Sequence, residues 1–480
     1  MPDRNKPCGD RVELQNSYVK LPDRFYQKIC PEKFSDPKLV LFNHDLADEL
    51  GLNLSDASEI AQLCSGQRLL PGSQPIAQAY AGSQFGHFSP QLGDGRAHLL
   101  GELKGLDLQL KGSGRTRFSR RGDGRSPLGP AIREFLVSEA MHALGVPTTR
   151  SLSVVTTGET VYRQDGPTPG AILARVAESH LRVGTFQYFA SQGDLEALEI
   201  LTNYTIKRHY PGIRSTQISD CCLELLRLFA ERQGDLVARW YALGFIHGVM
   251  NTDNCSMAGI TIDYGPCAFL DEFHQMKVFS SIDKFGRYAY GNQMAIVEWN
   301  IHRLADCLLP LIADDPQRAV SMAEQVLEEP LASFHNRLYL GFARKLGLKS
   351  LPEEGHTLVI DFLRYLQAHS LDFTLSFSHL RSLYEGDTHF YPVTSELHSF
   401  LSRWKALDPD LYQMDSINPR LIPRNHQIEK VITHANQGDY QPFEQMWEAL
   451  KSPFEVSEEY GYLMDAPKMS ERVYQTFCGT

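Results

Sequence analysis

The sequence predicts an α+β fold with two lobes, a mixed β lobe followed by a mostly helical lobe, and an extension at each end. Alternating or β-branched runs, which are typical of strands, lie between residues 107 and 176. From Asp194 onward, apolar residues recur at helical spacing instead. We therefore expect four regions: 1–70, an N-terminal extension; 71–190, the N-lobe with nucleotide-binding loops; 191–400, the helical C-lobe; and 401–480, a helical region with a cysteine-bearing tail.

The individual elements follow from local patterns. Residues Asp107–Lys111 alternate polar and apolar side chains, which predicts a strand that ends on a lysine. A helix is predicted from about Ala131 to Leu144, where Gly145 ends an apolar stripe. The runs in 150–163 predict two strands around Thr157-Gly158, and a further strand covers 171–176. Other predicted helices are Asp45–Leu52, Ala57–Cys64, Ser219–Leu243 and Ile296–Ile312.

Composition limits the classes of partner. The 480 residues include 47 Lys plus Arg and 58 Asp plus Glu, so the net charge is −11, which argues against a nucleic-acid partner. No secretory segment and no long apolar run is visible, so we expect a cytoplasmic monomer that does not span a membrane. The nine cysteines lack metal-ligand spacing and are interpreted as reduced thiols.

The segment from Phe245 to Phe269 resembles the nucleotide-and-metal segment of a protein kinase. A kinase has His-Arg-Asp, four residues, Asn, a short strand and Asp-Phe-Gly. Here Asn254 follows His247 by seven residues, and Ile260–Ile262 predicts a half-buried strand that ends at Asp263-Tyr264-Gly265. The predicted fold is therefore protein-kinase-like. Val249 stands where a kinase has its catalytic Asp, and valine cannot accept a proton.

Two oxygen donors in this segment predict a metal site. The amide of Asn254 and the carboxylate of Asp263 are ligands that Mg²⁺ or Mn²⁺ takes while keeping water and phosphate oxygens. Taken alone, Asp-Tyr-Gly is more often turn chemistry. The spacing to His247 makes the metal interpretation the better one.

Several residues upstream are candidates for binding phosphate. Gly93 and Gly95 allow close approach of backbone, and Arg96 supplies a fork of donors, although tight turns explain glycines equally well. Lys111 and Glu134 are candidates for the strand-lysine and helix-glutamate pair of a kinase. Arg175 and Arg182, seven residues apart, could clamp phosphate, with ordinary surface charge as the alternative.

Longer blocks resemble the selenoprotein O family, the protein adenylyltransferases with a pseudokinase fold. They include QFGHFSPQLGDGRA (84–97), LQLKGSGRTRFSRRGDGR (108–125), ILARVAESHLRVG (172–184) and GFIHGVMNTDNCSMAGITIDYGP (244–266). The resemblance implies transfer of AMP from ATP to Ser, Thr or Tyr hydroxyls of proteins, with the nucleotide inverted relative to a kinase. It implies a base role for Asp253, metal ligation by Asn254 and Asp263, and nucleotide contacts from Gly93, Gly95, Arg96, Lys111, Asp123, Gly124, Arg175, Arg182 and Asp263, with Glu134 supporting Lys111.

The resemblance also raises a redox question. Family members carry Cys or selenocysteine near the C-terminus, and Cys478 fits that position on a tail that we expect to be exposed. Some bacterial members place its partner shortly after Asp-Tyr-Gly, but Phe279-Ser280-Ser281 offers no cysteine. If Cys478 responds to oxidants, mixed disulfides or a partner such as Cys255 or Cys267 remain.

Three alternatives to AMP transfer stay open. They are a conventional kinase that moves the γ-phosphate, a silent ATP-binding module, and transfer of UMP from UTP. Val249 speaks against the first, and the set of phosphate and metal candidates against the second. No residue can be identified that reads the base, so the third alternative is not separated from AMP transfer.

Overall fold

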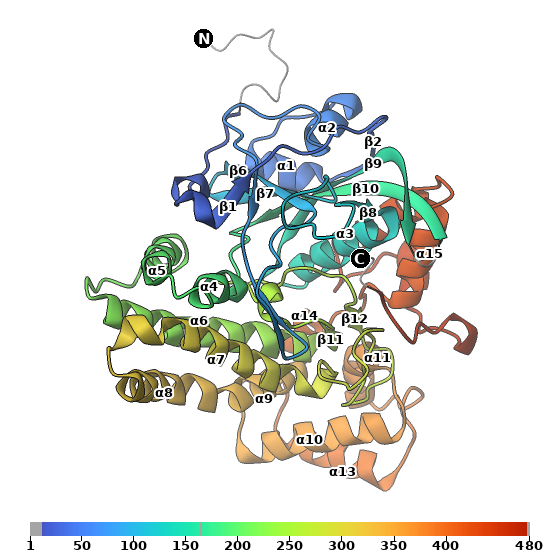
Figure 1. Cartoon of the computed structure of the whole chain (residues 1–480). Coiled ribbons are helices and arrows are strands. Elements are labelled where there is room, and N and C mark those ends of the chain that lie inside the picture. Colours follow the sequence, from blue (N-terminus) through green and yellow to red (C-terminus); the bar gives the residue numbers. More distant parts are fainter. Residues whose placement is uncertain (1–11, 164–165, 478–480) are drawn as a thin grey trace, which may run out of the picture.

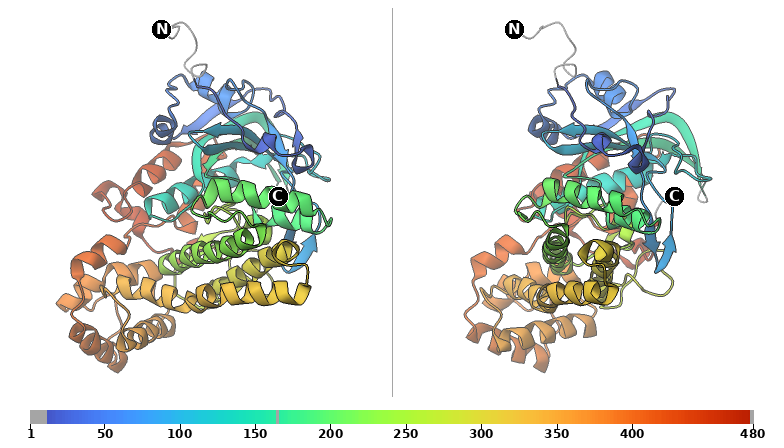
Figure 2. Two further views of the ribbon diagram at one scale, coloured as in Figure 1. Left: turned by 90° about the vertical axis from the view of Figure 1, so that its left-hand side faces the viewer. Right: turned by 60° about the vertical axis from the view of Figure 1, so that its left-hand side comes forward.

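The N-terminal half of the chain folds around one antiparallel sheet. The computed structural model describes residues 12–163 and 166–477, and it places this sheet above a set of helices (Figure 1 and Figure 2). The strand order is β1-β3-β6-β7-β10-β9-β2, with β8 paired to β10. The strands are β1 (Tyr26–Lys28), β2 (Lys38–Phe42), β3 (Ile76–Gln78), β6 (Ala97–Leu103), β7 (Leu106–Lys111), β8 (Ser126–Pro127), β9 (Arg150–Arg163) and β10 (Gly166–Ala177).

Both faces of the sheet are covered. Helices α1 (His44–Leu50) and α2 (Ala57–Cys64) pack with Ile172 and Ala174 of β10, whereas Leu173 joins the core on the side of α3 (Leu128–Ala143). Because successive strand side chains point to opposite faces, Arg175 lies on the same face as Leu173. The two-residue period therefore places this arginine on the side of the sheet that α3 covers.

The second half of the chain is helical and is built around one long helix. Helix α6 (Ile218–Leu243) packs against α7 (Gln293–Ile312), α8 (Pro316–Ala332) and α9 (Phe334–Lys345), as Figure 1 shows. None of the described helices combines the length and apolar character that crossing a bilayer requires. The other helices of this half are α4 (Val183–Ala190), α5 (Leu195–His209), α10 (Glu353–Ala368), α11 (Phe373–Ser378), α12 (Leu380–Glu385), α13 (Ser395–Ala406) and α14 (Leu411–Ile417).

The last two α-helices return to the N-terminal half. Helices α15 (Asn425–Ala435) and α16 (Gln441–Leu450) pack against α3, so helices far apart in the sequence lie side by side (Figure 1). The ring of Phe135 meets Phe443 and Trp447 edge-on, with centroids 5.4 and 5.5 Å apart. Helix α3 is thus held between the sheet and the C-terminal helices. Short 3-10 turns lie at Tyr18–Lys20, Asp23–Phe25, Thr252–Asn254, Tyr290–Asn292, Glu458–Met464 and Met469–Glu471.

Two of the predicted strand assignments are wrong. Residues 150–163 form the single strand β9, because Gly158 adopts a φ of 76° and the pairing with β10 shifts register there instead of breaking. Residues Ile260–Ile262 do not form a strand: only Thr261 makes a bridge, to Thr148, and all three side chains are buried. Burial on every side removes the alternation that a half-buried strand requires.

A buried arginine joins the C-terminal region to the helical lobe. The Arg424 guanidinium is 1% exposed and lies 2.9 Å from Asp271 Oδ1 and 2.8 Å from Asp372 Oδ2. Burial raises the pKa of Asp271 to about 6, although Arg424 opposes the shift. Because the guanidinium is buried, water cannot take the place of Arg424 as the partner of these two carboxylates.

We expect Arg424→Met to lower the free energy of unfolding by about 3–5 kcal/mol, because it leaves two buried carboxylates without their cation. Arg403→Met is the control, since Arg403 is 31% exposed in its pairs with Glu354 and Asp361 and should cost less than about 1 kcal/mol. Urea unfolding measures both, and equal losses in the two variants would contradict the structural role of Arg424.

Candidate active site

A cleft of about 460 Å³ lies between the sheet and residues 245–269, which we call the catalytic segment. A larger cavity, of about 820 Å³, is lined by Phe377, Arg381 and Met414 in the C-terminal half, but none of the predicted site residues reaches it. All twelve predicted site residues line the smaller cleft: Gly93, Gly95, Arg96, Lys111, Asp123, Gly124, Glu134, Arg175, Arg182, Asp253, Asn254 and Asp263. The cleft is therefore the candidate active site.

Lys111 bridges two carboxylates at the centre of the cleft. Its Nζ donates to Glu134 Oε2 at 2.6 Å and to Asp263 Oδ1 at 2.5 Å. Lys111 ends β7, whose Leu108 and Leu110 face the opposite core, so the strand period turns the lysine toward α3. The lysine–glutamate pair predicted from the sequence is present in the structure.

Two buried arginines reach the same carboxylate. Arg175 Nη1 donates to Asp263 Oδ1 at 2.7 Å and to Glu134 Oε1 at 2.9 Å. Arg182 Nη2 lies 3.5 Å from Asp263 Oδ2, and the guanidinium stacks on the ring of Tyr80 at 4.5 Å. Both side chains are 2% exposed, so the alternative of ordinary surface charge does not apply.

Asp263 is held as an anion in a strained conformation. Burial would raise the pKa of this carboxyl, but Arg175 and Lys111 lower it well below the usual range. The backbone adopts a φ of 65°, which is rare for a residue with a side chain and costs of order 1–3 kcal/mol. The surrounding contacts must therefore fix this residue.

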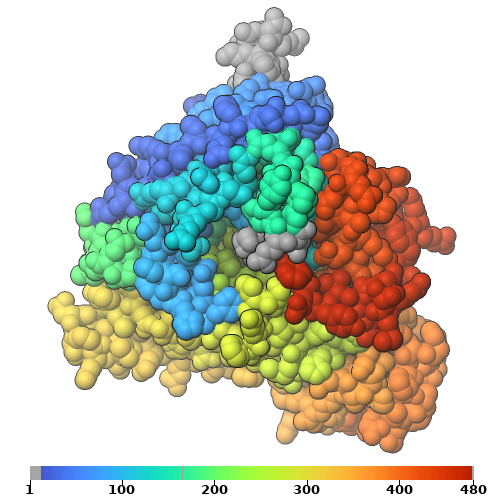
Figure 3. Space-filling model, turned by 45° about the vertical axis from the view of Figure 1, so that its right-hand side comes forward, coloured from blue at the N-terminus to red at the C-terminus, as the bar shows by residue number. Residues whose placement is uncertain are grey.

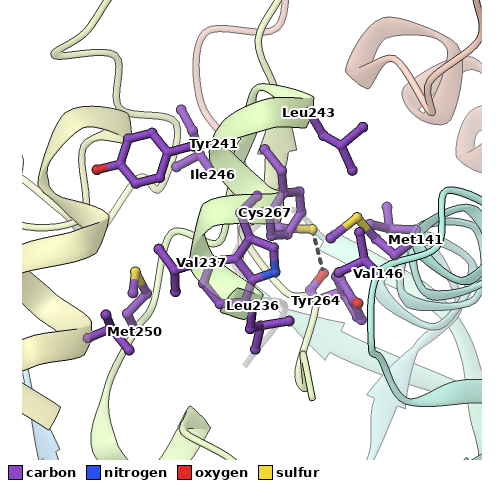
Figure 4. Packing of buried hydrophobic residues seen from close by; sticks show 14 of the residues in the cluster. Met141, Val146, Leu236, Val237, Tyr241, Leu243, Ile246, Met250, Tyr264 and Cys267 are labelled. Carbon is purple, nitrogen blue, oxygen red and sulfur yellow. Dashed lines mark hydrogen bonds between the residues drawn. The ribbon is translucent and has the colours of Figure 1, made fainter. Parts of the chain in front are cut away.

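The residues on both sides of Asp263 are anchored in the core. His247 Nε2 donates to the carbonyl of Ile262 at 2.9 Å, and burial lowers the pKa of this imidazole, so the neutral ring acts as a donor. On the other side, Tyr264 lies in the buried cluster that Figure 4 shows, where its carbonyl accepts from Cys267 Sγ. His247 thus positions the chain instead of reacting.

The catalytic segment brings one amide and one carboxylate to the cleft. Asn254 donates its Nδ2 to the carbonyl of Val249 at 2.9 Å, which leaves Oδ1 as an oxygen donor. Asp253 Oδ2 accepts from Gln84 Nε2 at 3.1 Å, and Oδ1 has no partner in the described part of the chain. Burial raises the pKa of Asp253 to about 6.

Packing against Phe118 requires glycine at positions 93 and 95. A Cβ on Gly93 would lie 2.2 Å from Cγ of Phe118, and one on Gly95 would lie 3.0 Å from the carbonyl oxygen of Phe118. Gly124 has a φ of 72° and approaches Gly114 in the same way. Phe118 is therefore the reason for the first two glycines, whatever ligand the loop binds.

Asp123 has a partner that the sequence did not reveal. Arg163, at the end of β9, donates to both of its oxygens, at 2.8 and 3.0 Å. Burial alone would raise the pKa of Asp123, but Arg163 lowers it. No motif marks Tyr80 in the sequence. Asp94 lies in a Gly-Asp-Gly-Arg run at 93–96 that recurs at 122–125, and this repeat is the one signal for it.

The redox prediction concerns three cysteines. Cys478 lies outside the described residues. The alternative partners Cys255 and Cys267 are both buried, and burial raises the pKa of Cys255 to about 12. No disulfide joins cysteines of the described segments. The tail is fixed as far as Thr476, whose hydroxyl donates to the carbonyl of Pro266 at 2.6 Å and whose side chain is buried.

The donor set at the cleft suits a hard cation. No group of three or more His, Cys, Asp or Glu that could hold a metal occurs among residues 12–163 and 166–477. Asn254 and Asp263 nevertheless supply an amide oxygen and a carboxylate to one cleft. Mg²⁺ and Mn²⁺ accept such a pair when phosphate and water oxygens complete the shell. The residues present therefore fit a metal bound together with a nucleotide.

Proteins of similar sequence are nucleotidyltransferases that act on proteins. A protein nucleotidyltransferase YdiU from Agrobacterium fabrum is 47% identical over 98% of this chain and 100% of its own length. Proteins of the same name from a Ruegeria species and from Geobacillus kaustophilus are 48% and 46% identical, each over 98% of this chain and 99% of their own.

The relatives, together with the two-lobed fold, define a kinase-like protein nucleotidyltransferase. The family described as protein adenylyltransferase SelO matches residues 10–451. This chain belongs to that family.

We expect Gly93→Ala to destabilise the protein by about 1–3 kcal/mol more than Gly105→Ala, because only the first puts a methyl group into the Phe118 ring. Both glycines have positive φ, at 66° and 82°, so backbone strain is matched between them. Urea unfolding without nucleotide makes the comparison. Equal stability would mean that Gly93 serves ligand binding alone.

Proposed function

We propose that this protein transfers AMP from ATP to Ser, Thr or Tyr hydroxyls of proteins, with release of pyrophosphate and dependence on Mg²⁺ or Mn²⁺. The observation that carries the proposal is the convergence of Lys111, Arg175 and Arg182 on Asp263, beside a buried Asp253. The family to which the chain belongs has the same activity in its description. We further propose that the enzyme acts in the cytoplasm as a monomer.

The charge of the cleft supports a polyphosphate substrate. The chain as a whole carries −11, yet seven cationic side chains line the cleft against five carboxylates. Cations concentrated in a hollow raise the local concentration of an anionic substrate. The cations are Arg96, Lys111, Arg120, Arg125, Arg163, Arg175 and Arg182, and the carboxylates are Asp94, Asp123, Glu134, Asp253 and Asp263.

We assign the phosphates and the metal to different parts of this set. Lys111, Arg175 and Arg182 hold the phosphates and stabilise the charge that develops on the departing pyrophosphate. Glu134 holds Lys111 and Arg175 in place through its two oxygens. Asn254 and Asp263 would hold the cation, which supplies charge neutralisation of the triphosphate when bound.

The chemical step is a displacement at the α-phosphorus. The acceptor oxygen forms a bond to the α-phosphorus, the bond from that phosphorus to the α,β-bridging oxygen of ATP breaks so that pyrophosphate departs with this oxygen, and the hydroxyl proton passes to a base. Asp253 is our candidate for that base, because the residue lines the cleft and its buried Oδ1 has no hydrogen-bond partner among the described residues. Val249 occupies the kinase position of the base and lines the same cleft.

Experiment can distinguish AMP transfer from the three alternative activities. Phosphate transfer as in a kinase would need a base at Val249, which is a buried aliphatic side chain. A silent module would bind ATP without turnover. UMP transfer from UTP would use the same residues.

We expect label to enter protein from ATP labelled at the α-phosphate and not at the γ-phosphate, and Asp263→Ala to abolish it. The variant removes the proposed metal ligand and leaves Lys111 and Arg175 with Glu134 alone as their shared anion. Asp306→Ala, which changes an exposed aspartate paired with Arg303, is the control and should label like the wild type. Chelation of divalent cations should also remove the signal. Entry of γ-label would make the protein a kinase, and labelling by Asp263→Ala would refute the metal assignment.

We expect Asp253→Asn to lower the rate of AMP transfer about 10²–10⁴-fold while nucleotide binding persists. The amide has the same shape and keeps the contact with Gln84, but it cannot accept the hydroxyl proton. Single-turnover transfer and equilibrium binding of a fluorescent ATP analogue measure the two effects. A variant that transfers AMP at the wild-type rate would exclude Asp253 as the base.

A further inference from the structure

One wall of the cleft is a small hairpin bonded to the catalytic segment. Strands β4 (Gly82–Gln84) and β5 (His87–Ser89) pair with each other and join no other strand of the described chain. Gln84 donates to the proposed base Asp253, and the backbone N–H of Ser83 donates to Thr252 Oγ1 at 2.6 Å. The hairpin is therefore fixed to the residues that carry the chemistry.

The tip of this hairpin is strained and held in place. Phe85 and Gly86 have φ of 52° and 86°, a turn that is unfavourable for a bulky residue such as phenylalanine. The N–H of Phe85 lies 3.2 Å from both Asn251 Oδ1 and the hydroxyl of Tyr288. Local strain of this kind persists only where the surroundings fix it, often at a functional site.

The loop of residues 280–290 forms the adjoining surface. Asp283 accepts from the backbone N–H of Arg287 and Tyr288 at 2.9 and 2.8 Å, which fixes the shape of the loop. The hydroxyl of Tyr288 donates to Asn251 Oδ1 at 2.5 Å. Figure 3 shows the hairpin, in blue, next to the yellow-green loop on one face of the molecule.

Large apolar side chains are exposed on this wall. Phe285 is 99% exposed, Ile282 is 52% exposed and Phe88 is 47% exposed, and Ile282 also lines the cleft. We call Phe88, Ile282 and Phe285 the apolar rim. Apolar side chains left in water at the mouth of a polar cleft are typical of an interaction surface.

We propose that the apolar rim and the outer edge of β5 bind an extended segment of the acceptor protein, with an apolar side chain near the hydroxyl that receives AMP. This inference rests on the proposed function. A Ser, Thr or Tyr hydroxyl lies only one side-chain length from its own backbone. For this hydroxyl to enter the cleft, the acceptor polypeptide must therefore cross the wall beside Asp253. That wall is the hairpin, since Gln84 touches Asp253.

The edge of β5 supplies the backbone part of the recognition. No described strand pairs with its outer side, and His87 and Phe88 are exposed. An exposed strand edge binds an extended peptide through main-chain hydrogen bonds, while neighbouring side-chain sites select its residues. The rim supplies such a site for an apolar residue.

The test uses peptide libraries with a fixed central Tyr, Ser or Thr and one flanking position varied at a time, together with α-labelled ATP. We expect the wild type to prefer an apolar residue at a flanking position by about tenfold over Asp or Gly. Phe285→Ser and Phe88→Ser should each flatten the preference and leave binding of the fluorescent ATP analogue unchanged. Methylation of backbone nitrogens in the preferred peptide should lower its labelling.

The control is Tyr412→Ser, which removes another aromatic ring that is 86% exposed, on α14, and should keep the preference. Labelling without any flanking preference, or a preference that survives in Phe285→Ser and Phe88→Ser, would overturn the docking proposal alone. Absence of α-label from the wild type with every library and with whole-protein acceptors would instead overturn the proposed function, and the docking proposal with it.

Discussion

The site depends on a cluster of buried charges around Asp263. Its carboxylate meets Lys111 and Arg175 directly, and both cations share Glu134 as their second anion. Each charge is expensive to bury alone, so removing one member leaves the others unpaired. The cluster joins β7, β10, α3 and the catalytic segment at one point. A single electrostatic constraint therefore fixes how the sheet and the helical lobe meet.

The C-terminal helices extend this constraint to the far end of the chain. Glu134 can hold two cations only if α3 keeps its position, and α3 packs on α15 and on α16, where Phe135 meets Phe443 and Trp447. Arg133, the residue before Glu134, pairs with Glu429 of α15. Residues distant in sequence thus position the glutamate at the centre of the cleft. Apart from its cysteine, the last region of the chain gives no chemical signal in its sequence, and the contribution of its described helices is packing.

The sequence predicts contacts that belong to a known pattern better than contacts that do not. The kinase-like pattern predicts the pair of Lys111 with Glu134, but it does not predict that Asp263 also contacts Lys111 and Arg175. The pair of Asp123 with Arg163 depends on where the long strand β9 ends, which local pattern does not reveal. Gly93 was interpreted through phosphate, whereas its contact is Phe118, from a loop 25 residues later. Such contacts arise only when the chain has folded.

Asn251 connects the nucleotide side of the cleft with the proposed acceptor side. Its Oδ1 accepts from Tyr288 and from the N–H of Phe85, and it lies three residues before the proposed metal ligand Asn254. Displacement of the 280–290 loop would therefore pull on the hairpin and on the catalytic segment together. An acceptor that binds across the apolar rim would press on the same contacts. If the acceptor binds as we propose, the hydrogen bonds of Gln84 and Asn251 would couple its binding to the position of Asp253 without direct contact with the nucleotide.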